Sequence, residues 1–334
     1  MIPRSANPCQ TPSWRSALGD AFVCPEALID YLELDRSLLP GARTAAARFG
    51  LRVPRTYAAR MEKGNPRDPL LLQVLPMGAE LEHHPGFGTD PVGDLAAVTS
   101  PGLLHKYQGR ALLIATGACA VNCRYCFRRH FPYQDAAGGS QRWRGALDYL
   151  RREPGIREII LSGGDPLMMA DARLAELIRA LETIPHLARL RIHTRMPVIV
   201  PERVTDGLLA SLKNTRLRPV IVIHCNHANE LSGEVHRPLQ RLRDAGGTLL
   251  NQSVLLKGIN DSPEAQIALC ESLFETGVLP YYLHLLDPVQ GAAHFEVRRE
   301  DAIELHQRLR RRLPGYLVPR LVQELAGAPA KMPL

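Results

Sequence analysis

The feature that most constrains this chain is a regular alternation of short apolar runs and amphipathic stretches that begins near residue 105. Each apolar run has the length of a β-strand. The six candidate strands are 111–117, 158–164, 190–195, 219–225, 248–256 and 280–287. The helix-like stretches between and after them are 141–152, 171–184, 202–213, 234–245, 263–276 and 300–312. Strands that alternate with such helices predict an α/β fold with a parallel sheet, here a partial (β/α)6 barrel, two units short of the closed form.

The regions before and after this alternation have a different character. Residues 1–104 carry helical fragments such as "PEALIDYLEL" and "RTYAARM", followed by the Pro/Gly-rich stretch "HHPGFGTDPVGD". We therefore expect a mostly helical accessory segment over 1–104 that covers one end of the barrel. The barrel itself is expected over 105–313 and a short C-terminal tail over 314–334.

Composition narrows the classes of protein that the chain can represent. The apolar share of 45% and the charged share of 22% are those of a soluble globular protein. The formal charge of +7 is spread along the chain, with no low-complexity basic tail, so we expect no nucleic-acid partner. We find no secretory signal and no apolar run of about eighteen residues, so we expect no membrane partner. Only three of the seven cysteines cluster, which favours a reducing, cytoplasmic location.

The clustered cysteines are Cys119, Cys123 and Cys126, in a loop directly after the first predicted strand. Loops at this end of barrel strands carry the chemistry in α/β barrels. With His130 as a fourth ligand, the thiolates would form a Cys3His zinc site. Alternatively, the three thiolates hold a [4Fe–4S] cluster whose fourth iron is free to bind a substrate. The spacing alone leaves both interpretations open.

The spacing CxxxCxxC, with Tyr125 before the last cysteine, resembles the signature loop of the radical S-adenosylmethionine (SAM) enzymes. This resemblance implies that the open iron binds the amino and carboxyl groups of SAM. The next predicted strand ends in Ser162, Gly163, Gly164 and Asp165, where that superfamily has a glycine pair followed by an acid. Such a stretch alone is an ordinary strand-to-helix turn. Next to the cysteine loop it predicts a SAM contact, because glycines let the backbone approach a ligand.

The resemblance extends over most of the chain and points to one family. The chain resembles the lysine 2,3-aminomutase family in "GLLHKYQGRALLIATGACAVNCRYCFRRHF", "RLRIHTRMPVIVPERVT", "NQSVLLKGIND" and "PYYLHLLDPVQGAAHF". It is similar to the branch that makes (R)-β-lysine for elongation factor P in "LRVPRTYAARMEKGNPRDPLL" and "GYLVPRLVQELAGAPAKMPL". The resemblance implies an isomerase that converts L-lysine to (R)-β-lysine with pyridoxal 5'-phosphate (PLP) as a further cofactor. It also implies a link to elongation factor P and its lysyl-tRNA-synthetase-like ligase, and an electron donor of the flavodoxin or ferredoxin type.

The resemblance assigns cofactor contacts residue by residue. It implies that Lys331 holds PLP as an aldimine, although this chain has "AGAPAK" where the family's pattern is glycine-rich. The stretch "HKYQGR" matches the family's cofactor-binding stretch, so Lys106, Tyr107 and Arg110 are candidates for the phosphate; the alternative is a basic strand edge. Three polar residues at strand ends are either cofactor contacts or buried strand caps, and these are His224, Asn251 and Gln252.

Substrate contacts follow in the same way. Arg128 matches the family's arginine for the substrate carboxylate, while Arg129 is expected at the surface or balancing the cluster. Asp287 and Glu324 match the acids that meet the far ammonium of lysine, although lysine enzymes usually have aspartate at the second position. Two acids favour lysine over glutamate as the substrate. We expect free lysine, because the PLP linkage requires a free α-amine.

Two alternatives remain. One is a radical aminomutase of lysine catabolism or of another amino acid; the chain stops soon after Lys331, where the catabolic enzymes have a long extension, and this favours the elongation factor branch. The other is a zinc-stapled basic binding protein, which leaves the glycine pair and the six strand–helix units without a role. The oligomeric state stays open, with a homo-oligomer among the alternatives.

Overall fold

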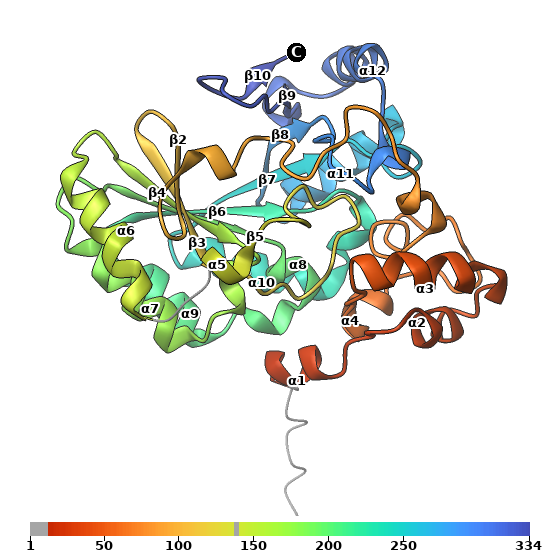
Figure 1. Ribbon diagram of the computed structural model, residues 1–334, viewed down its shortest axis with the longest axis horizontal. Coiled ribbons are helices and arrows are strands. Elements are labelled where there is room, and N and C mark those ends of the chain that lie inside the picture. Colours follow the sequence, from red (N-terminus) through yellow and green to blue (C-terminus); the bar gives the residue numbers. More distant parts are fainter. Residues whose placement is uncertain (1–12, 137–139) are drawn as a thin grey trace, which may run out of the picture.

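Ten strands form one sheet in which every strand lies beside its neighbour in the chain (Figure 1). The computed structural model describes residues 13–136 and 140–334. The parallel strands are β3 (Arg110–Thr116), β4 (Glu158–Gly163), β5 (Arg189–Thr194), β6 (Arg218–His224), β7 (Thr248–Val254), β8 (Leu279–His284) and β9 (Arg320–Gln323). The six predicted strands are therefore confirmed as β3 to β8.

The two edges of the sheet are antiparallel. At one edge, β1 (Val98–Ser100) and β2 (Leu103–Tyr107) form a hairpin whose second strand pairs with β3. At the other edge, β10 (Met332–Pro333) pairs with β9. The predicted tail is thus part of the sheet, because β9 extends the parallel series by one strand.

The long helices lie between the parallel strands, mostly where the sequence predicts them. They are α6 (Ser140–Arg152), α7 (Asp171–Glu182), α9 (Asp206–Lys213), α10 (Gly233–Asp244), α11 (Pro263–Glu275) and α12 (Arg299–Arg312). The start of α11 shows why the prediction works: the Ser262 hydroxyl accepts from the Ala265 amide, and Pro263 fills the first helical position. The predicted helix 202–213 begins later in the structure, because residues 202 and 203 belong to the 3-10 turn Pro201–Arg203 and α9 starts after its cap Thr205. The short helix α8 (Met196–Ile199) lies just before this turn.

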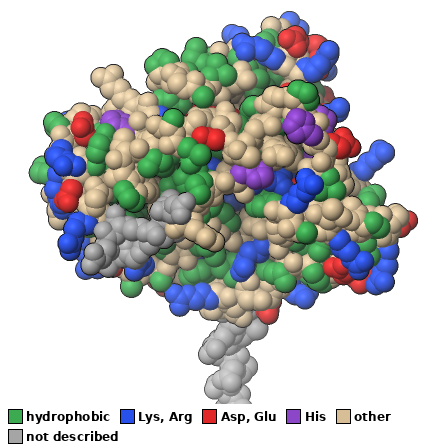
Figure 2. Space-filling model, viewed as in Figure 1, with side chains coloured by type: hydrophobic (Ala, Val, Ile, Leu, Met, Phe, Trp, Pro, Cys, Tyr) green, Lys and Arg blue, Asp and Glu red, His purple; other side chains and the backbone are tan. Residues whose placement is uncertain are grey.

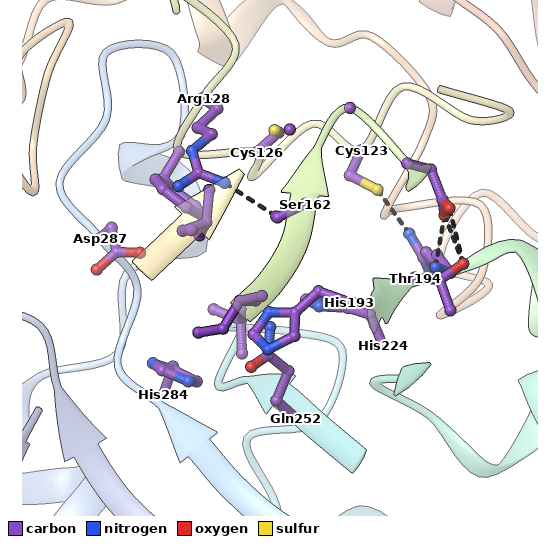
Figure 3. Close-up of a pocket in the computed structure, with 18 of the residues that line it drawn as sticks. Cys123, Cys126, Arg128, Ser162, His193, Thr194, His224, Gln252, His284 and Asp287 are labelled. Atoms are coloured by element: carbon purple, nitrogen blue, oxygen red, sulfur yellow. Dashed lines mark hydrogen bonds between the residues drawn. The ribbon is translucent and has the colours of Figure 1, made fainter. Parts of the chain in front are cut away.

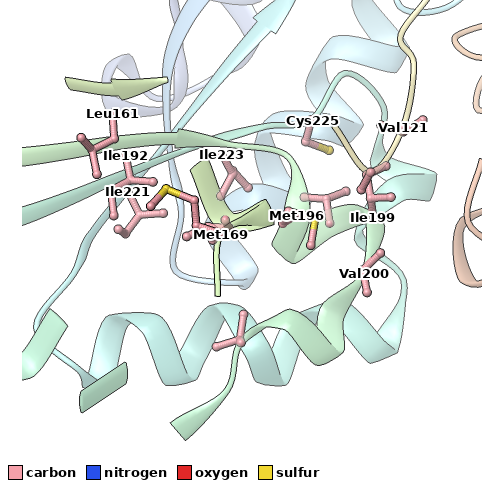
Figure 4. Close-up of a cluster of buried hydrophobic side chains, with 14 of the residues drawn as sticks. Val121, Leu161, Met169, Ile192, Met196, Ile199, Val200, Ile221, Ile223 and Cys225 are labelled. Carbon is pink, nitrogen blue, oxygen red and sulfur yellow. The ribbon is translucent and has the colours of Figure 1, made fainter. Parts of the chain in front are cut away.

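Strands joined in chain order place their helices on one face of the sheet and leave the other face open, as in a barrel wall. Side chains on the helix-covered face form the main hydrophobic core (Figure 4). Leu161, Ile192 and Ile221 come from three adjacent strands and pack with Met196 and Ile199 of α8. The opposite face of the same strands is available for a site.

Helices are the main regular structure of the N-terminal segment, as predicted, and they lie at one end of the molecule (Figure 1). Its helices are α1 (Trp14–Gly19), α2 (Pro25–Tyr31), α3 (Leu39–Arg48) and α4 (Arg55–Ala58). It is tied to the barrel loops because the Thr56 hydroxyl donates to the Ile199 carbonyl at 3.0 Å. Within the described residues, no helix has the length and apolar content for a membrane crossing. Figure 2 shows Lys and Arg side chains at many separate places on the face that it draws.

Candidate active site

A pocket of about 320 Å³ lies on the open face of the sheet, and strands β2 to β8 all contribute to its wall. Because alternate residues of a strand point to the same side, the lining residues come in pairs two positions apart. Examples are Arg191 with His193 on β5 and Tyr282 with His284 on β8. Figure 3 shows these strands converging on the pocket with Cys123 and Cys126 at one side.

The three clustered cysteines all line this pocket. Burial, reinforced by the neighbouring Cys123 thiol, raises the pKa of Cys126 to about 11. Burial also raises the pKa of Cys119, so ionising these two thiols requires positive charge, which an iron–sulfur cluster supplies when bound. Arg195 provides part of it, since its Nη1 lies 2.8 Å from the Cys123 Sγ. The chemistry of this donor set fits a [4Fe–4S] cluster with one iron left open.

The geometry does not support the zinc alternative. His130, the proposed fourth ligand, is exposed and does not line the pocket, and its Nε2 lies 3.2 Å from the Gln290 carbonyl.

The cysteine loop is held from outside by the N-terminal segment. The Asn122 amide donates to the Arg52 carbonyl at 3.1 Å, and its side chain donates to the Gly50 carbonyl at 2.8 Å. Arg124 is fully buried and forms a bidentate pair with Glu80 at 2.8 and 2.6 Å. Arg129 binds the same carboxylate at 2.8 Å and is buried, so it is not the surface residue that the sequence suggested. This buried ion triad fixes the loop that carries the thiols.

The predicted glycine–acid stretch lines the pocket, and the packing of the backbone also requires glycine at positions 163 and 164. A Cβ on Gly163 would meet the Thr116 carbonyl oxygen at 2.5 Å, and one on Gly164 would meet the Ala118 carbonyl oxygen at 2.3 Å. The glycines therefore let β4 pack closely against the start of the cysteine loop. Asp165 accepts hydrogen bonds from the Thr194 hydroxyl and from three backbone amides, and so joins the ends of β4 and β5.

The Lys331 amine also lies on the pocket wall. Its Nζ is 2.9 Å from Glu324 Oε2 and 3.4 Å from His284 Nε2, and it lies 5.7 Å from the centre of the Tyr282 ring. An amine at a pocket wall, beside an aromatic ring, fits a lysine that carries PLP. Although burial alone would raise it, Lys331 and Lys106 hold the pKa of Glu324 down to about 2.

The three candidate phosphate contacts all line the pocket, but the two cations among them differ in whether a carboxylate already pairs with them. The Lys106 amine is 2.5 Å from Asp94 Oδ1 and 3.1 Å from Glu324 Oε1, so it is already neutralised. Arg110 stacks on the Tyr107 ring at 4.5 Å and has no carboxylate within 4.0 Å among the described residues. Of the two cations, Arg110 is therefore the one that is available to bind an anion.

The candidate substrate contacts lie in the same pocket. Arg128 Nε donates to Asp94 Oδ2 at 2.6 Å, and its Nη1 donates to the Ser162 hydroxyl at 3.1 Å. Asp287 differs from the other acids, because its Oδ1 is buried without a hydrogen-bond partner among the described residues. Burial and the nearby Glu324 raise the pKa of Asp287 to about 7. An unpartnered buried carboxylate fits the far ammonium of lysine.

Two of the three remaining candidates reach the pocket. His224 and Gln252 line it, and burial with the nearby Arg195 lowers the pKa of His224 to about 3, so that it is neutral. Asn251 does not, because neighbouring residues of a strand point to opposite faces. Its side chain instead pairs with the backbone of Cys225, accepting at 3.0 Å and donating at 3.1 Å.

Several pocket residues were not identified from the sequence. His193 and Arg195 carry a signal that could have found them, because polar residues alternate along the inner face of an otherwise apolar strand. Burial lowers the pKa of His193, and its Nε2 has no hydrogen-bond partner among the described residues. Asp94 gives no such signal, since it lies in the irregular Pro/Gly-rich stretch and reaches the pocket only through the fold.

Comparisons with known proteins agree with this geometry. Residues 113–269 match the Radical SAM superfamily. The chain is 49% identical to the L-lysine 2,3-aminomutase of Escherichia coli, over 97% of this chain and 96% of that protein. It is 48% identical to the L-lysine 2,3-aminomutase of Haemophilus influenzae, over 96% of this chain and 94% of that protein. It is 35% identical to the L-lysine 2,3-aminomutase of Clostridium subterminale, over 96% of this chain and 77% of that protein. The chain therefore belongs to the L-lysine 2,3-aminomutase family, whose members are isomerases built on the radical SAM fold.

Proposed function

We propose that this protein converts free L-lysine to (R)-β-lysine and uses PLP in addition to the cluster and SAM. The observation that carries the proposal is the position of the Lys331 amine in the same pocket as the Cys119, Cys123 and Cys126 thiols. A site for radical generation and an amine that can carry PLP thus face one space. The identity to relatives named L-lysine 2,3-aminomutase over nearly the whole chain supports the same reaction.

When bound, the cluster and SAM supply the radical that removes hydrogen from the β-carbon of lysine, and PLP supplies the π system across which nitrogen migrates. The protein binds, orients and excludes water. The three thiolates hold the cluster, Lys331 attaches PLP, and Arg110 with Tyr107 binds its phosphate. Because burial keeps His193 and His224 neutral, neither imidazole adds charge between the two cofactor sites.

The two ends of the substrate have complementary partners. Arg128 offers a guanidinium to the α-carboxylate, and a planar guanidinium binds a carboxylate with two hydrogen bonds. Asp287 offers its unpartnered oxygen to the side-chain ammonium. Lysine within a protein chain has no free carboxylate for Arg128, so these contacts favour the free amino acid.

We assign the product to the modification of elongation factor P by its lysyl-tRNA-synthetase-like ligase, in the cytoplasm. Support comes from the resemblance of 51–71 and 315–334 to that branch of the family. The reaction also needs a one-electron reductant, for which a flavodoxin or ferredoxin type of carrier is suited.

The test is anaerobic reconstitution with iron and sulfide, followed by addition of SAM, PLP, dithionite and L-lysine. We expect (R)-β-lysine by chiral chromatography and mass spectrometry. Lys331→Ala should abolish the product and PLP binding but keep the cluster absorbance, whereas Lys213→Ala, an exposed lysine on α9, should retain activity. Formation of 5'-deoxyadenosine without β-lysine would show that the substrate assignment is wrong.

A further inference from the structure

The outer wall of the cysteine loop is a short stretch of the N-terminal segment, residues 48–55, which we call the strap. Its carbonyls at Phe49, Gly50 and Arg52 accept hydrogen bonds from Asn122 and Arg124. Asn122 and Arg124 flank Cys123 directly in sequence. The strap is therefore one hydrogen bond away from the backbone that carries the thiols. In Figure 1 the cysteine loop extends toward the helices of this segment.

The other side of the strap is a surface. Arg48 and Arg55 are exposed, and Gly50 between them is exposed as well. The opposite face of the cluster site is the pocket, which substrate and SAM occupy during reaction. Electrons from a protein too large to enter that pocket must therefore reach the cysteine loop from outside, and the strap is an exposed segment that contacts this loop there.

The surface around the strap is basic and includes an exposed apolar side chain. Arg15 on α1 is exposed, and the Arg52 guanidinium contacts the Leu18 carbonyl at 3.1 Å, which joins α1 to the strap. Val23 is 65% exposed and follows Phe22, which pairs with Val53 of the strap. Phe22 also lies under the Arg55 guanidinium at 4.3 Å.

The cations of this surface are not neutralised. Arg15, Arg48, Arg52 and Arg55 have no carboxylate within 4.0 Å in the described part of the chain. This contrasts with the neighbouring Arg43, which is paired with Glu26. Asp20 lies at the end of α1 and also forms no ion pair, so it offsets one of the four positive charges. Unpaired charge around an exposed apolar residue is typical of a surface that steers and then holds an oppositely charged partner.

We propose that the surface formed by Arg15, Arg48, Arg52, Arg55 and Val23 is the docking site of an acidic electron-carrier protein. The proposal rests on the proposed function, because only a cluster that must be reduced from outside needs such a partner. In the docked complex the reduced carrier loses one electron and the cluster gains it, and no atoms are exchanged. The strap's hydrogen bonds to Asn122 and Arg124 provide the short route between them.

The test compares a protein donor with a small one. The reconstituted protein is mixed with a reduced, acidic flavodoxin, and separately with dithionite, and the loss of cluster absorbance is followed by stopped flow without lysine. The test variant is Arg48→Glu with Arg55→Glu. The matched control is Arg310→Glu with Arg311→Glu, which makes the same change of charge at exposed, unpaired positions on α12.

We expect added salt to slow reduction of the wild-type protein by flavodoxin, and the test variant to be slower by about ten-fold at low salt. Dithionite rates should be equal in all three proteins, and the control should match the wild type with flavodoxin. Equal flavodoxin rates in test and control variants would overturn the proposal. So would a test variant that is slow with dithionite as well, because the cluster rather than docking would then be altered. A protein that shows this pattern but makes no β-lysine would keep the docking site and lose only the substrate assignment.

Discussion

The carboxylate of Asp94 accepts a 2.6 Å hydrogen bond from the Nε of Arg128, and both side chains are almost completely buried. The second oxygen of Asp94 pairs with Lys106. One acid from the N-terminal segment therefore pairs with two cations of the pocket and offsets one of their two charges. Despite its burial, Arg128 and Lys106 hold the pKa of Asp94 below its ordinary value, so the pairing is present at neutral pH and is lost as the pH falls below the usual carboxyl range.

Replacing Asp94 with asparagine should destabilise the protein, because two buried cations lose their partner. We expect a loss of about 3–5 kcal/mol in the free energy of unfolding, measured with urea on the protein without cofactors. Asp148→Asn is the control, since it breaks an exposed pair with Arg151 and should cost less than about 1 kcal/mol. Equal losses in the two variants would contradict this account.

Gly164→Ala should disrupt the packing of β4 against the cysteine loop. The added Cβ would meet the Ala118 carbonyl oxygen at 2.3 Å, and backbone at that point cannot move without displacing the thiols. We expect less cluster bound per chain and a lower melting temperature. In Gly145→Ala, on α6, the Cβ meets nothing within 4 Å, and the protein should gain roughly 0.5–1 kcal/mol. Normal cluster content in Gly164→Ala would be the contrary result.

Asp287→Asn should raise stability at high pH while impairing catalysis. The pKa of Asp287 is about 7 in the folded protein, above the ordinary value of 3.8, so the folded state holds the proton more tightly. Stability should therefore fall as the pH rises from about 4 to about 7, and the lost amount should return in the variant at pH 8. Unfolding in urea at pH 5 and pH 8 measures this.

The exposed Asp261→Asn should show no such pH-dependent gain. Because the ammonium of lysine loses its partner, the KM for lysine should rise at least ten-fold in Asp287→Asn. A variant with an unchanged KM would remove Asp287 from the substrate site.

Arg110→Gln should weaken PLP binding by about ten- to a hundred-fold, because a hydrogen bond to a charged group contributes roughly 1.5–3 kcal/mol. The affinity is measured by titrating PLP and following its visible absorbance. Arg218→Gln, at the exposed start of β6, should bind PLP like the wild type. If Arg110→Gln also bound PLP normally, the phosphate would have to be placed elsewhere in the pocket.

The sequence predicted the parallel sheet and its helices because strand and helix periodicities differ strongly in this chain. It also predicted that residues at or just after the ends of strands, such as Cys119 and Ser162, lie in the site, and both line the pocket. The sequence did not predict which face of a strand a side chain occupies. Asn251 and Gln252 are adjacent in sequence, yet they face opposite sides of β7, and only Gln252 lines the pocket.

Ion pairs between residues that lie far apart in the sequence could not be predicted either. Nothing in the irregular stretch around Asp94 indicates that it will meet Lys106 and Arg128, and nothing near Glu324 indicates that it will join Lys106 to Lys331. These contacts depend on the curvature of the whole sheet, which brings Lys106 of β2 next to Glu324, directly after β9. Charge balance in the site is therefore a property of the fold and not of any motif.

The chain order of the strands has a consequence for protein synthesis. A ribosome completes β3 and the three cysteines long before it reaches β9 and Lys331. A nascent chain that ends at β8 already carries the three clustered thiols but not the Lys331 amine. The three thiols and the Lys331 amine come to face one pocket only when β9 pairs with β8, so an unfinished chain cannot assemble the complete pocket.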